Sequence, residues 1–116
     1  TRYRYVTGVQ TCALPIYLKA AQDDGTVVDW DIIDVREPWE HALCALPNAR
    51  LMPMQSLPLR LQELDPKRPT VVLCHHGMRS FQVAAWLERN GFTDVANLSG
   101  GIDAWAREIE PGMTQY

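Results

Sequence analysis

Residues 70–80 read TVVLCHHGMRS and join an apolar run, a short polar loop and the start of a helical pattern. The continuous apolar run at 70–73 is typical of a strand buried inside a parallel sheet. Apolar residues at helical spacing begin after Ser80 and continue to Asn90-Gly91, a typical helix end. A buried strand followed directly by a helix predicts a βα unit.

Strand and helix patterns alternate along the rest of the chain as well. The apolar, β-branched run at 31–35 predicts a buried strand, and Pro38 just after it suits the first turn of a helix. Further strands are expected over 49–52 and 95–98, and further helices over 17–22, 57–64 and 102–109. This alternation predicts an α/β domain with a mostly parallel sheet.

The composition limits the size of the domain and the class of its partners. The chain has 116 residues, of which 47% are hydrophobic and 22% charged, so it fits one globular domain with its own core. A net charge of -3 gives no reason to expect binding to nucleic acid or to an anionic membrane. No apolar run approaches the ~20 residues of a membrane-spanning helix.

The cysteines indicate the cellular compartment. Cys12, Cys44 and Cys74 show no C-x-x-C spacing. Their odd number and wide spacing argue against a disulfide framework or a zinc site and allow a free reactive thiol. No basic segment followed by an apolar one is visible near the start, so no secretory signal is expected. These features predict a reducing, cytoplasmic location.

The first residues carry a pattern of a different kind. Residues 6–16 read VTGVQTCALPI. A DNA string that resembles a common sequencing-library adapter encodes this peptide without a mismatch. We therefore expect residues 1–16 to be non-native and the domain to span 17–116; a genuine N-terminal arm is the alternative. On this hypothesis Cys12 has no function, the residues before Tyr17 pack poorly, and their deletion leaves the chemistry of the domain intact.

Cys74 is the candidate nucleophile because it stands where a buried strand ends. Open α/β sheets bind ligands at the carboxyl ends of their strands. Backbone N–H groups of a short loop and a helix N-terminus attract anions, so a thiolate at their focus would be stabilised. Gly77 permits unusual backbone angles, Arg79 adds positive charge at the loop mouth, and Ser80 suits the helix N-cap. This pattern favours a cysteine that attacks an anionic substrate over an inert buried one.

The segment CHHGMRS at 74–80 resembles the active-site loop of the rhodanese-like domain family. Residues 34–37, DVRE, resemble that family's early D-V-R-E motif, and residues 98–105, LSGGIDAW, resemble its late L-x-G-G-x-x-x-W motif. Residues 46–49, LPNA, are similar to its I-P-G-A turn, with Asn48 in place of glycine.

This resemblance covers 17–116 and implies a three-layer α/β fold, with a mostly parallel central sheet of about five strands and helices on both faces. It implies a single-domain sulfurtransferase of the thiosulfate sulfurtransferase type. A sulfane sulfur would pass from thiosulfate or a persulfide donor to the Cys74 thiolate, and from that persulfide to cyanide or a thiol acceptor. No metal or organic cofactor is implied. The resemblance assigns catalysis to Cys74, the active-site loop to His75, His76, Gly77, Met78, Arg79 and Ser80, and supporting positions to Asp34, Arg36, Gly100 and Gly101.

Other functions use the same residues differently. A persulfide carrier would exchange sulfur with a sulfur-relay protein and turn over little free thiosulfate. The domain could also be the C-terminal piece of a longer enzyme. Cysteine phosphatases and arsenate reductases of the same fold place five residues between Cys and Arg, whereas four separate Cys74 from Arg79. The smaller loop favours sulfur over phosphate or arsenate.

The two loop histidines are expected to line the pocket and to bind no metal. Adjacent residues such as His75 and His76 are expected to point apart in a tight loop, and no carboxylate is close to them in sequence. Gly100 and Gly101 are expected to let another loop pass close to the active site.

The remaining polar residues near the motifs are expected to be structural. Asp34 and Arg36 would form an ion pair that holds the end of a strand, with a substrate-facing role for Arg36 as the alternative. Cys44 would be a small buried residue, with a resolving thiol as the alternative.

Overall fold

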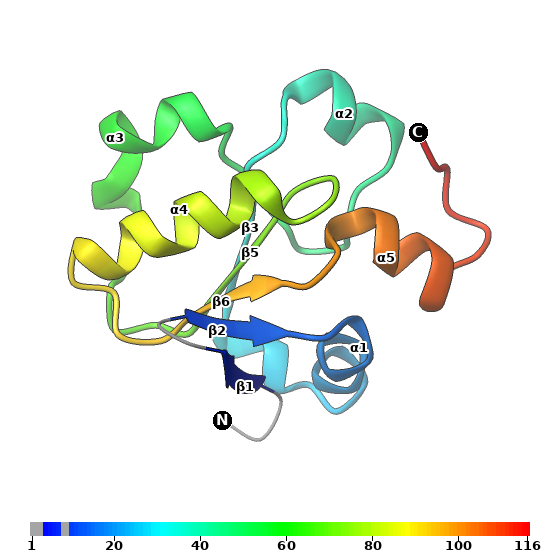
Figure 1. Cartoon of the computed structure of the whole chain (residues 1–116), viewed down its shortest axis with the longest axis horizontal. Helices are drawn as coiled ribbons and strands as arrows, with labels where there is room; N and C mark the ends of the chain where they lie inside the picture. Colours follow the sequence, from blue (N-terminus) through cyan, green and yellow to red (C-terminus); the bar gives the residue numbers. More distant parts are fainter. Residues whose placement is uncertain (1–3, 8–9) are drawn as a thin grey trace.

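The computed structural model describes residues 4–7 and 10–116, which form a six-stranded sheet with helices on both faces (Figure 1). The order across the sheet is β1-β2-β6-β5-β3-β4. The strands are β1 (Arg4–Thr7), β2 (Gln10–Ala13), β3 (Asp31–Asp34), β4 (Arg50–Leu51), β5 (Thr70–Leu73) and β6 (Val95–Leu98). Only the pair β1–β2 is antiparallel, so the predicted, mostly parallel sheet of about five strands is confirmed, with β1 as a sixth strand at one edge.

Two groups of helices cover the sheet and produce the expected three layers. The helices are α1 (Pro15–Asp23), α2 (Pro38–Leu43), α3 (Leu57–Arg60), α4 (Met78–Arg89) and α5 (Gly101–Glu108), with short 3-10 turns η1 (Thr26–Asp29), η2 (Met54–Ser56) and η3 (Leu61–Glu63). On one face, Val72 packs in a core with Leu57 of α3 and Leu87 of α4. On the other, Val71 packs with Leu18 of α1 and Trp105 of α5. Because successive side chains of β5 enter different cores, this strand needs the continuous apolar run seen in the sequence.

Three helix boundaries differ from the expected ones for local reasons. α3 ends at Arg60 and a separate turn follows, because Arg60 itself has the non-helical angles φ -116° and ψ 9°. α4 begins at Met78, two residues earlier than expected, because Gly77 rather than Ser80 is its N-cap. α1 begins at Pro15, a residue suited to a first helical turn since it has no N–H to leave unpaired.

The segment expected to pack poorly contributes a strand next to β6. Register pairs Thr11 with Ala96 and Ala13 with Leu98, and the Ser99 N–H donates to the Ala13 carbonyl at 2.8 Å. The side chains of Ala13 and Pro15 are buried. The expectation of poor packing is therefore wrong for these two residues, since an edge like that of β6 accepts any strand whose backbone can pair. The non-native origin of 1–16 stays a prediction.

None of the helices in the described part of the chain has the length and apolar content to cross a membrane.

Candidate active site

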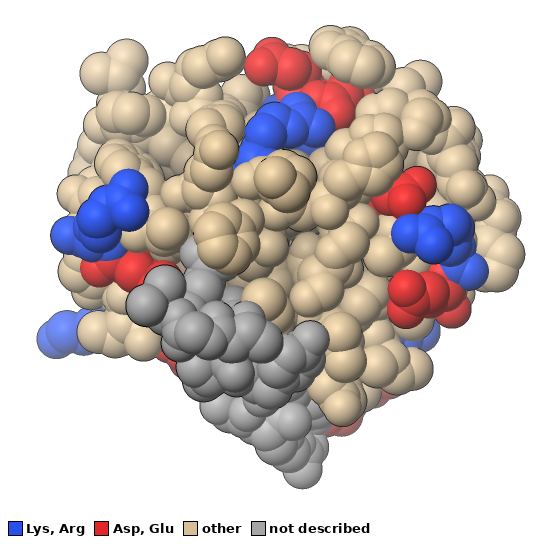
Figure 2. Space-filling view, in the orientation of Figure 1, with Lys and Arg blue, Asp and Glu red and all other residues tan. Residues whose placement is uncertain are grey.

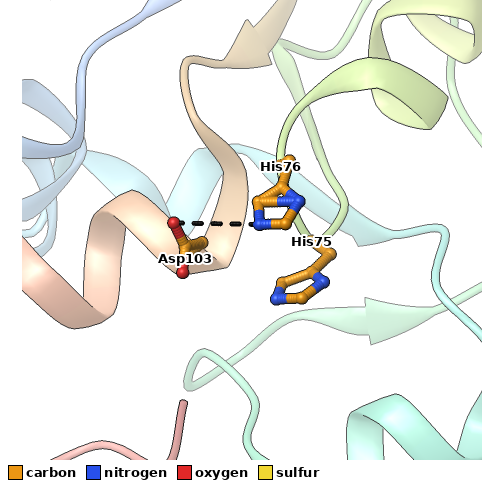
Figure 3. A group of neighbouring side chains, drawn as sticks. All are labelled: His75, His76 and Asp103. Atoms are coloured by element: carbon orange, nitrogen blue, oxygen red, sulfur yellow. Dashed lines mark ion pairs between the residues drawn. The ribbon is translucent and has the colours of Figure 1, made fainter. Parts of the chain in front are cut away.

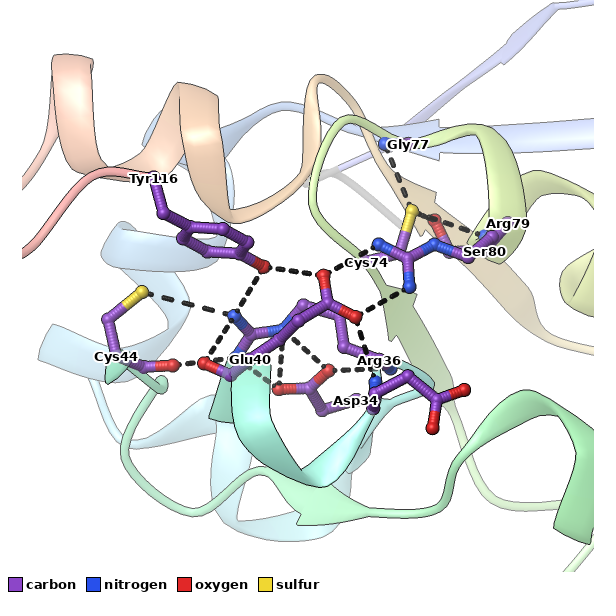
Figure 4. Close-up of polar contacts among 10 residues, drawn as sticks. Asp34, Arg36, Glu40, Cys44, Cys74, Gly77, Arg79, Ser80 and Tyr116 are labelled. Carbon is purple, nitrogen blue, oxygen red and sulfur yellow. Dashed lines mark hydrogen bonds and ion pairs between the residues drawn. The ribbon is translucent and has the colours of Figure 1, made fainter. Parts of the chain in front are cut away.

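The loop after β5 points its backbone N–H groups at the Cys74 sulfur (Figure 4). Sγ accepts hydrogen bonds from the Gly77 N–H at 3.1 Å and from the Ser80 N–H at 3.4 Å. Gly77 has φ +103°, a left-handed angle that glycine adopts without strain and that turns its N–H inward. Cys74 is 1% exposed, so these donors act on the sulfur where water does not compete. The arrangement stabilises negative charge on Sγ.

The N-terminus of α5 holds the loop carbonyls away from the sulfur. The Ile102 N–H donates to the Cys74 carbonyl at 2.8 Å, and the Asp103 N–H donates to the His75 carbonyl at 3.0 Å. Gly101 has φ +63°, and a Cβ added there would lie 2.4 Å from the Cys74 carbonyl oxygen. The predicted close approach is therefore confirmed at Gly101, where a side chain would collide with the loop backbone.

Asn97 of β6 holds the loop after β5 through hydrogen bonds to Gly77 and Ser80. Its Nδ2 donates to the Gly77 carbonyl at 3.2 Å, and its Oδ1 accepts from the Ser80 hydroxyl at 2.5 Å. The Ser80 oxygen also lies 3.3 Å from Cys74 Sγ. Ser80 thus sits inside α4 and faces the sulfur, so its expected role as N-cap is wrong. Sequence reasoning missed Asn97, whose only signal is a polar residue inside an otherwise apolar strand.

Glu40 of α2 holds the loop arginine in a two-pronged ion pair. Arg79 Nη1 lies 2.7 Å from Oε2, and Nη2 lies 2.9 Å from Oε1. The Glu37 N–H also donates to Oε2 at 2.9 Å, which closes a capping box at the start of α2. The hydrogen bonds from Arg79 lower the pKa of Glu40 from 4.5 to about 2, against the opposing effect of burial. Arg79 therefore stands at the loop mouth as expected, but Glu40 compensates its charge.

Sequence reasoning also missed Glu40 as a site residue. Its signal was the Glu37-x-x-Glu40 spacing of a capping box, which indicates a helix start but not the partner across the site.

Arg36 is fully buried and its guanidinium is bound by neighbouring groups of the protein. Its Nε and Nη2 donate to Asp34 at 2.9 and 2.6 Å, and Nη2 also donates to the Cys44 carbonyl at 2.7 Å. Its Nη1 donates to the Glu40 carbonyl at 3.2 Å. Burial opposes the charge of Arg36, but its hydrogen bonds to Asp34 and Tyr116 outweigh burial and raise its pKa. The structural ion pair with Asp34 is confirmed, and the substrate-facing alternative is wrong because all three guanidinium nitrogens are engaged.

Tyr116 closes one wall of the site from the far end of the chain. Its hydroxyl donates to Glu40 Oε1 at 2.8 Å and accepts from Arg36 Nη1 at 2.9 Å. Burial raises the pKa of Tyr116 to about 12, so the hydroxyl keeps its proton at neutral pH. Its ring stacks on His75 with centroids 3.8 Å apart. Sequence reasoning missed this residue because no local pattern links it to the loop.

The loop histidines stack on each other, so the expectation that they point apart is wrong. Their ring centroids are 4.0 Å apart, and Asp103 of α5 brings a carboxylate oxygen 3.9 Å from His76 Nε2 (Figure 3). Burial and the neighbouring His76 lower the pKa of His75. These three side chains are the metal-ligand candidates of the site.

The other residues near the loop are apolar or lie to one side. Met78 and Phe81 are 74% and 47% exposed on the first turn of α4. Cys44 is half-buried with Sγ 3.9 Å from Arg36 Nη1, and Figure 4 shows it across the Glu40 side chain from Cys74. This placement gives no support to a resolving role for Cys44.

Comparison with known proteins gives a consistent result. The family model of the Rhodanese-like domain matches residues 14–108. A sulfurtransferase of Allochromatium vinosum is 42% identical over 80 residues, which cover 69% of this chain and 75% of that protein. The thiosulfate sulfurtransferase GlpE of Pseudomonas fluorescens is 33% identical over 100 residues, which cover 86% of this chain and 87% of that protein.

A longer relative and a solved structure extend the comparison. The chain spans about a third of the Rhodanese-like/PpiC domain-containing protein 12 of Arabidopsis thaliana, with 36% identity over 106 residues, 88% of this chain and 32% of that protein. The crystal structure of a rhodanese-like domain protein from Staphylococcus aureus superposes with a TM-score of 0.75 at 32% identity, covering 89% of this chain and 95% of that one.

Proposed function

Because this chain belongs to the rhodanese-like domain family, we propose that it is a sulfurtransferase in which Cys74 carries the transferred sulfur as a persulfide. The observation that carries the proposal is the set of backbone N–H donors, from Gly77 and Ser80, that converge on a buried Cys74 sulfur. Two relatives named as sulfurtransferases, each similar over more than two thirds of this chain, support the same reaction class.

The reaction consists of two displacements at sulfur. In the first, the Cys74 thiolate attacks the outer sulfur of thiosulfate; the new S–S bond forms as the bond to the sulfonate sulfur breaks, and sulfite leaves with the electron pair. In the second, cyanide or a thiolate attacks the terminal sulfur and the Cys74 thiolate leaves. The N–H groups of Gly77 and Ser80 stabilise the Cys74 thiolate before the first step and after the second.

The electrostatics of the loop favour sulfur over phosphate. Four residues separate Cys74 from Arg79, and the Arg79 guanidinium is already paired with Glu40. A tetrahedral phosphate or arsenate would have to compete with the Glu40 carboxylate for the charge of Arg79. The terminal sulfur of a persulfide needs only the backbone N–H groups.

Mass spectrometry of the intact protein tests the persulfide. After incubation with thiosulfate, the wild type and Cys44→Ser should gain about 32 Da, one sulfur atom, whereas Cys74→Ser should gain nothing. Cys44→Ser is the matched control because Cys44 lies to the side of the site. An unchanged gain in Cys74→Ser would refute the assignment of the nucleophile. No gain in the wild type with thiosulfate or with a small persulfide would refute the reaction.

A carrier that receives sulfur from a partner protein is the second candidate. The exposed Met78 and Phe81 beside the loop favour it, since apolar side chains around an active site suit contact with another protein. A carrier would take one sulfur from a protein persulfide in a single turnover much faster than it turns over thiosulfate. An enzyme that acts on thiosulfate would show comparable rates for both.

The charge distribution agrees with small anionic or protein partners rather than nucleic acid. On the described part of the face in Figure 2, basic and acidic side chains lie in small mixed groups. The described part of this face has no broad basic area to hold a phosphate backbone.

A further inference from the structure

The active-site loop and α5 bring three metal-ligand side chains together beside Cys74. Each of His75, His76 and Asp103 offers one ligand atom, and these atoms all lie within 4.8 Å of one another. Figure 3 shows the two imidazoles on the loop and the carboxylate on the facing helix. We propose that these three residues bind a divalent transition-metal ion, with Zn²⁺ as the reference ion.

Backbone and ring contacts hold His75 and the helix that carries Asp103 in place. The Asp103 N–H donates to the His75 carbonyl at 3.0 Å, so the helix that carries the carboxylate is bonded to the loop that carries the imidazoles. His75 is held between Tyr116 on one face, at 3.8 Å, and His76 on the other, at 4.0 Å. Two of the ligands are thus placed before any ion arrives.

The remaining adjustment falls on His76, which is more exposed than Asp103. A tetrahedral zinc ion with bonds of about 2.0–2.1 Å places its ligand atoms about 3.4 Å apart. His76 Nε2 lies 3.9 Å from Asp103 Oδ2, and the His76 side chain is 62% exposed, so it can turn toward the carboxylate without disturbing the core.

The ligand types select the class of ion. Two imidazoles and one carboxylate suit Zn²⁺ and the neighbouring ions Co²⁺, Ni²⁺ and Cu²⁺, whereas Mg²⁺ and Ca²⁺ prefer oxygen ligands alone. Three protein ligands leave at least one coordination position open. Because His76 lies at the surface, that position faces solvent at the mouth of the Cys74 loop and can take an anionic ligand such as sulfite.

One charged neighbour competes with the ion for the carboxylate. Arg107 on the next turn of α5 pairs with Asp103, with Nη2 2.9 Å from Oδ2. A bound ion shares this oxygen or displaces the arginine, whose side chain is more than half exposed. We therefore expect micromolar rather than nanomolar affinity.

Calorimetric titration with Zn²⁺ tests the site in the full chain. Cys74→Ser serves as the background, since it removes the thiol next to His75 in the sequence and keeps all three ligands. We expect one ion per chain, with Kd raised at least about tenfold by adding either His76→Ala or Asp103→Asn. His41→Ala, which changes the third histidine of the chain, is the matched control and should leave Kd unchanged.

Two results would overturn the proposal. One is the absence of saturable Zn²⁺ binding in the Cys74→Ser background. The other is a Kd that neither His76→Ala nor Asp103→Asn changes, which would place the ion elsewhere. Co²⁺ spectra identify the competing thiol site, because a thiolate-to-cobalt charge-transfer band in the wild type that vanishes in Cys74→Ser reports cysteine ligation. This site does not depend on the proposed sulfur transfer, so its failure leaves the persulfide experiment unaffected.

Discussion

At the scale of single residues, the Cys74 sulfur is surrounded by backbone donors whose direction other residues fix. Gly101 admits α5 against the loop and lets its N–H groups take the loop carbonyls. Asn97 takes the Gly77 carbonyl from the opposite side. With the carbonyls occupied on both sides, the N–H groups are left to face the sulfur. The direction of the loop N–H groups therefore depends on side chains, or their absence, outside the loop itself.

Gly101→Ala should severely destabilise the protein. The new Cβ would lie 2.4 and 2.5 Å from two backbone oxygens, and φ is +63° at this residue. Left-handed angles alone cost about 1–2 kcal/mol, so with the collision we expect the free energy of unfolding to fall by more than about 3 kcal/mol. Urea denaturation measures the change. Gly112→Ala, where a Cβ meets nothing within 4 Å, is the control and should stay within about 0.5 kcal/mol of wild type. Equal losses in both variants would contradict the close-approach argument.

Asn97→Leu should slow persulfide formation beyond its effect on stability. The substitution removes two buried hydrogen bonds, one to the Gly77 carbonyl and one from the Ser80 hydroxyl, which costs about 1–3 kcal/mol in stability. The loop N–H groups also lose their fixed direction, so we expect sulfur uptake from thiosulfate to slow by about tenfold at a temperature where the variant is folded.

Thr70→Val provides the comparison for Asn97→Leu. Thr70 is also buried, but it lies at the start of β5, at the opposite end of that strand from Cys74. Its hydroxyl donates to the Arg68 carbonyl. This variant should lose stability and keep its rate. A similar slowing in Thr70→Val would mean that the rate reports general stability rather than loop geometry.

The sequence predicted the site residues that lie in short local motifs, at 34–36, 74–80 and 100–101, and missed the residues outside those motifs. Cys74, Gly77 and Arg79 follow one strand in order, so spacing alone indicates their chemistry. Glu40 meets Arg79 across 39 residues, and Tyr116 meets Glu40 across 76, distances over which no periodic pattern extends. The three-ring stack of His76, His75 and Tyr116 was also unpredictable, because Tyr116 lies far from the loop in the sequence.

At the scale of elements, an ion-pair network ties α2 to α4 across the mouth of the site. Glu40 accepts from Arg79 of α4, from Tyr116 and from the Glu37 N–H, and it is almost fully buried. Arg36 extends the network beneath α2. The sequence indicated α2 through Pro38, but no local pattern indicated the contacts that join α2 to α4.

Glu40→Gln should remove a pH-dependent part of the stability. The folded protein lowers the pKa of Glu40 from 4.5 to about 2, so the charged form stabilises the fold fully above pH 4.5 and progressively less as pH falls toward 2. At pH 7 we expect the wild type to exceed Glu40→Gln by about 2–3 kcal/mol in urea denaturation. The difference should shrink between pH 4.5 and 2.

Glu63→Gln is the control for the Glu40 experiment. Glu63 also pairs with an arginine, Arg60, but the pair is exposed, so its loss should change stability little at any pH. A difference between wild type and Glu40→Gln that stayed constant down to pH 2 would contradict the buried-carboxylate explanation.

At the scale of the whole molecule, the alternating patterns were enough to predict the α/β class and the parallel sheet, but not its N-terminal edge. β3, β5 and β6 carry apolar runs that mark buried strands. β2 carries no such run, and it forms because the outer edge of β6 offers unpaired backbone groups. Pairing through backbone alone can recruit a segment whose sequence was never selected for the fold, so the paired β2 and the adapter hypothesis are compatible.

Deletion of residues 1–16 should weaken the fold without abolishing sulfur transfer. Register pairs three residues of β2 with Ala96, Asn97 and Leu98, so deletion opens the edge of β6 and should cost more than about 2 kcal/mol, at about 1 kcal/mol per lost hydrogen bond. The open edge should also promote self-association, measurable by light scattering. Cys74 should still gain sulfur in the folded fraction, because its donors come from Gly77 and Ser80.

Replacing residues 6–12 with an unrelated strand-forming sequence should restore stability if the original side chains of these residues contribute nothing to it. If only the original sequence restores it, the segment is a native part of the domain and the hypothesis of a non-native origin fails.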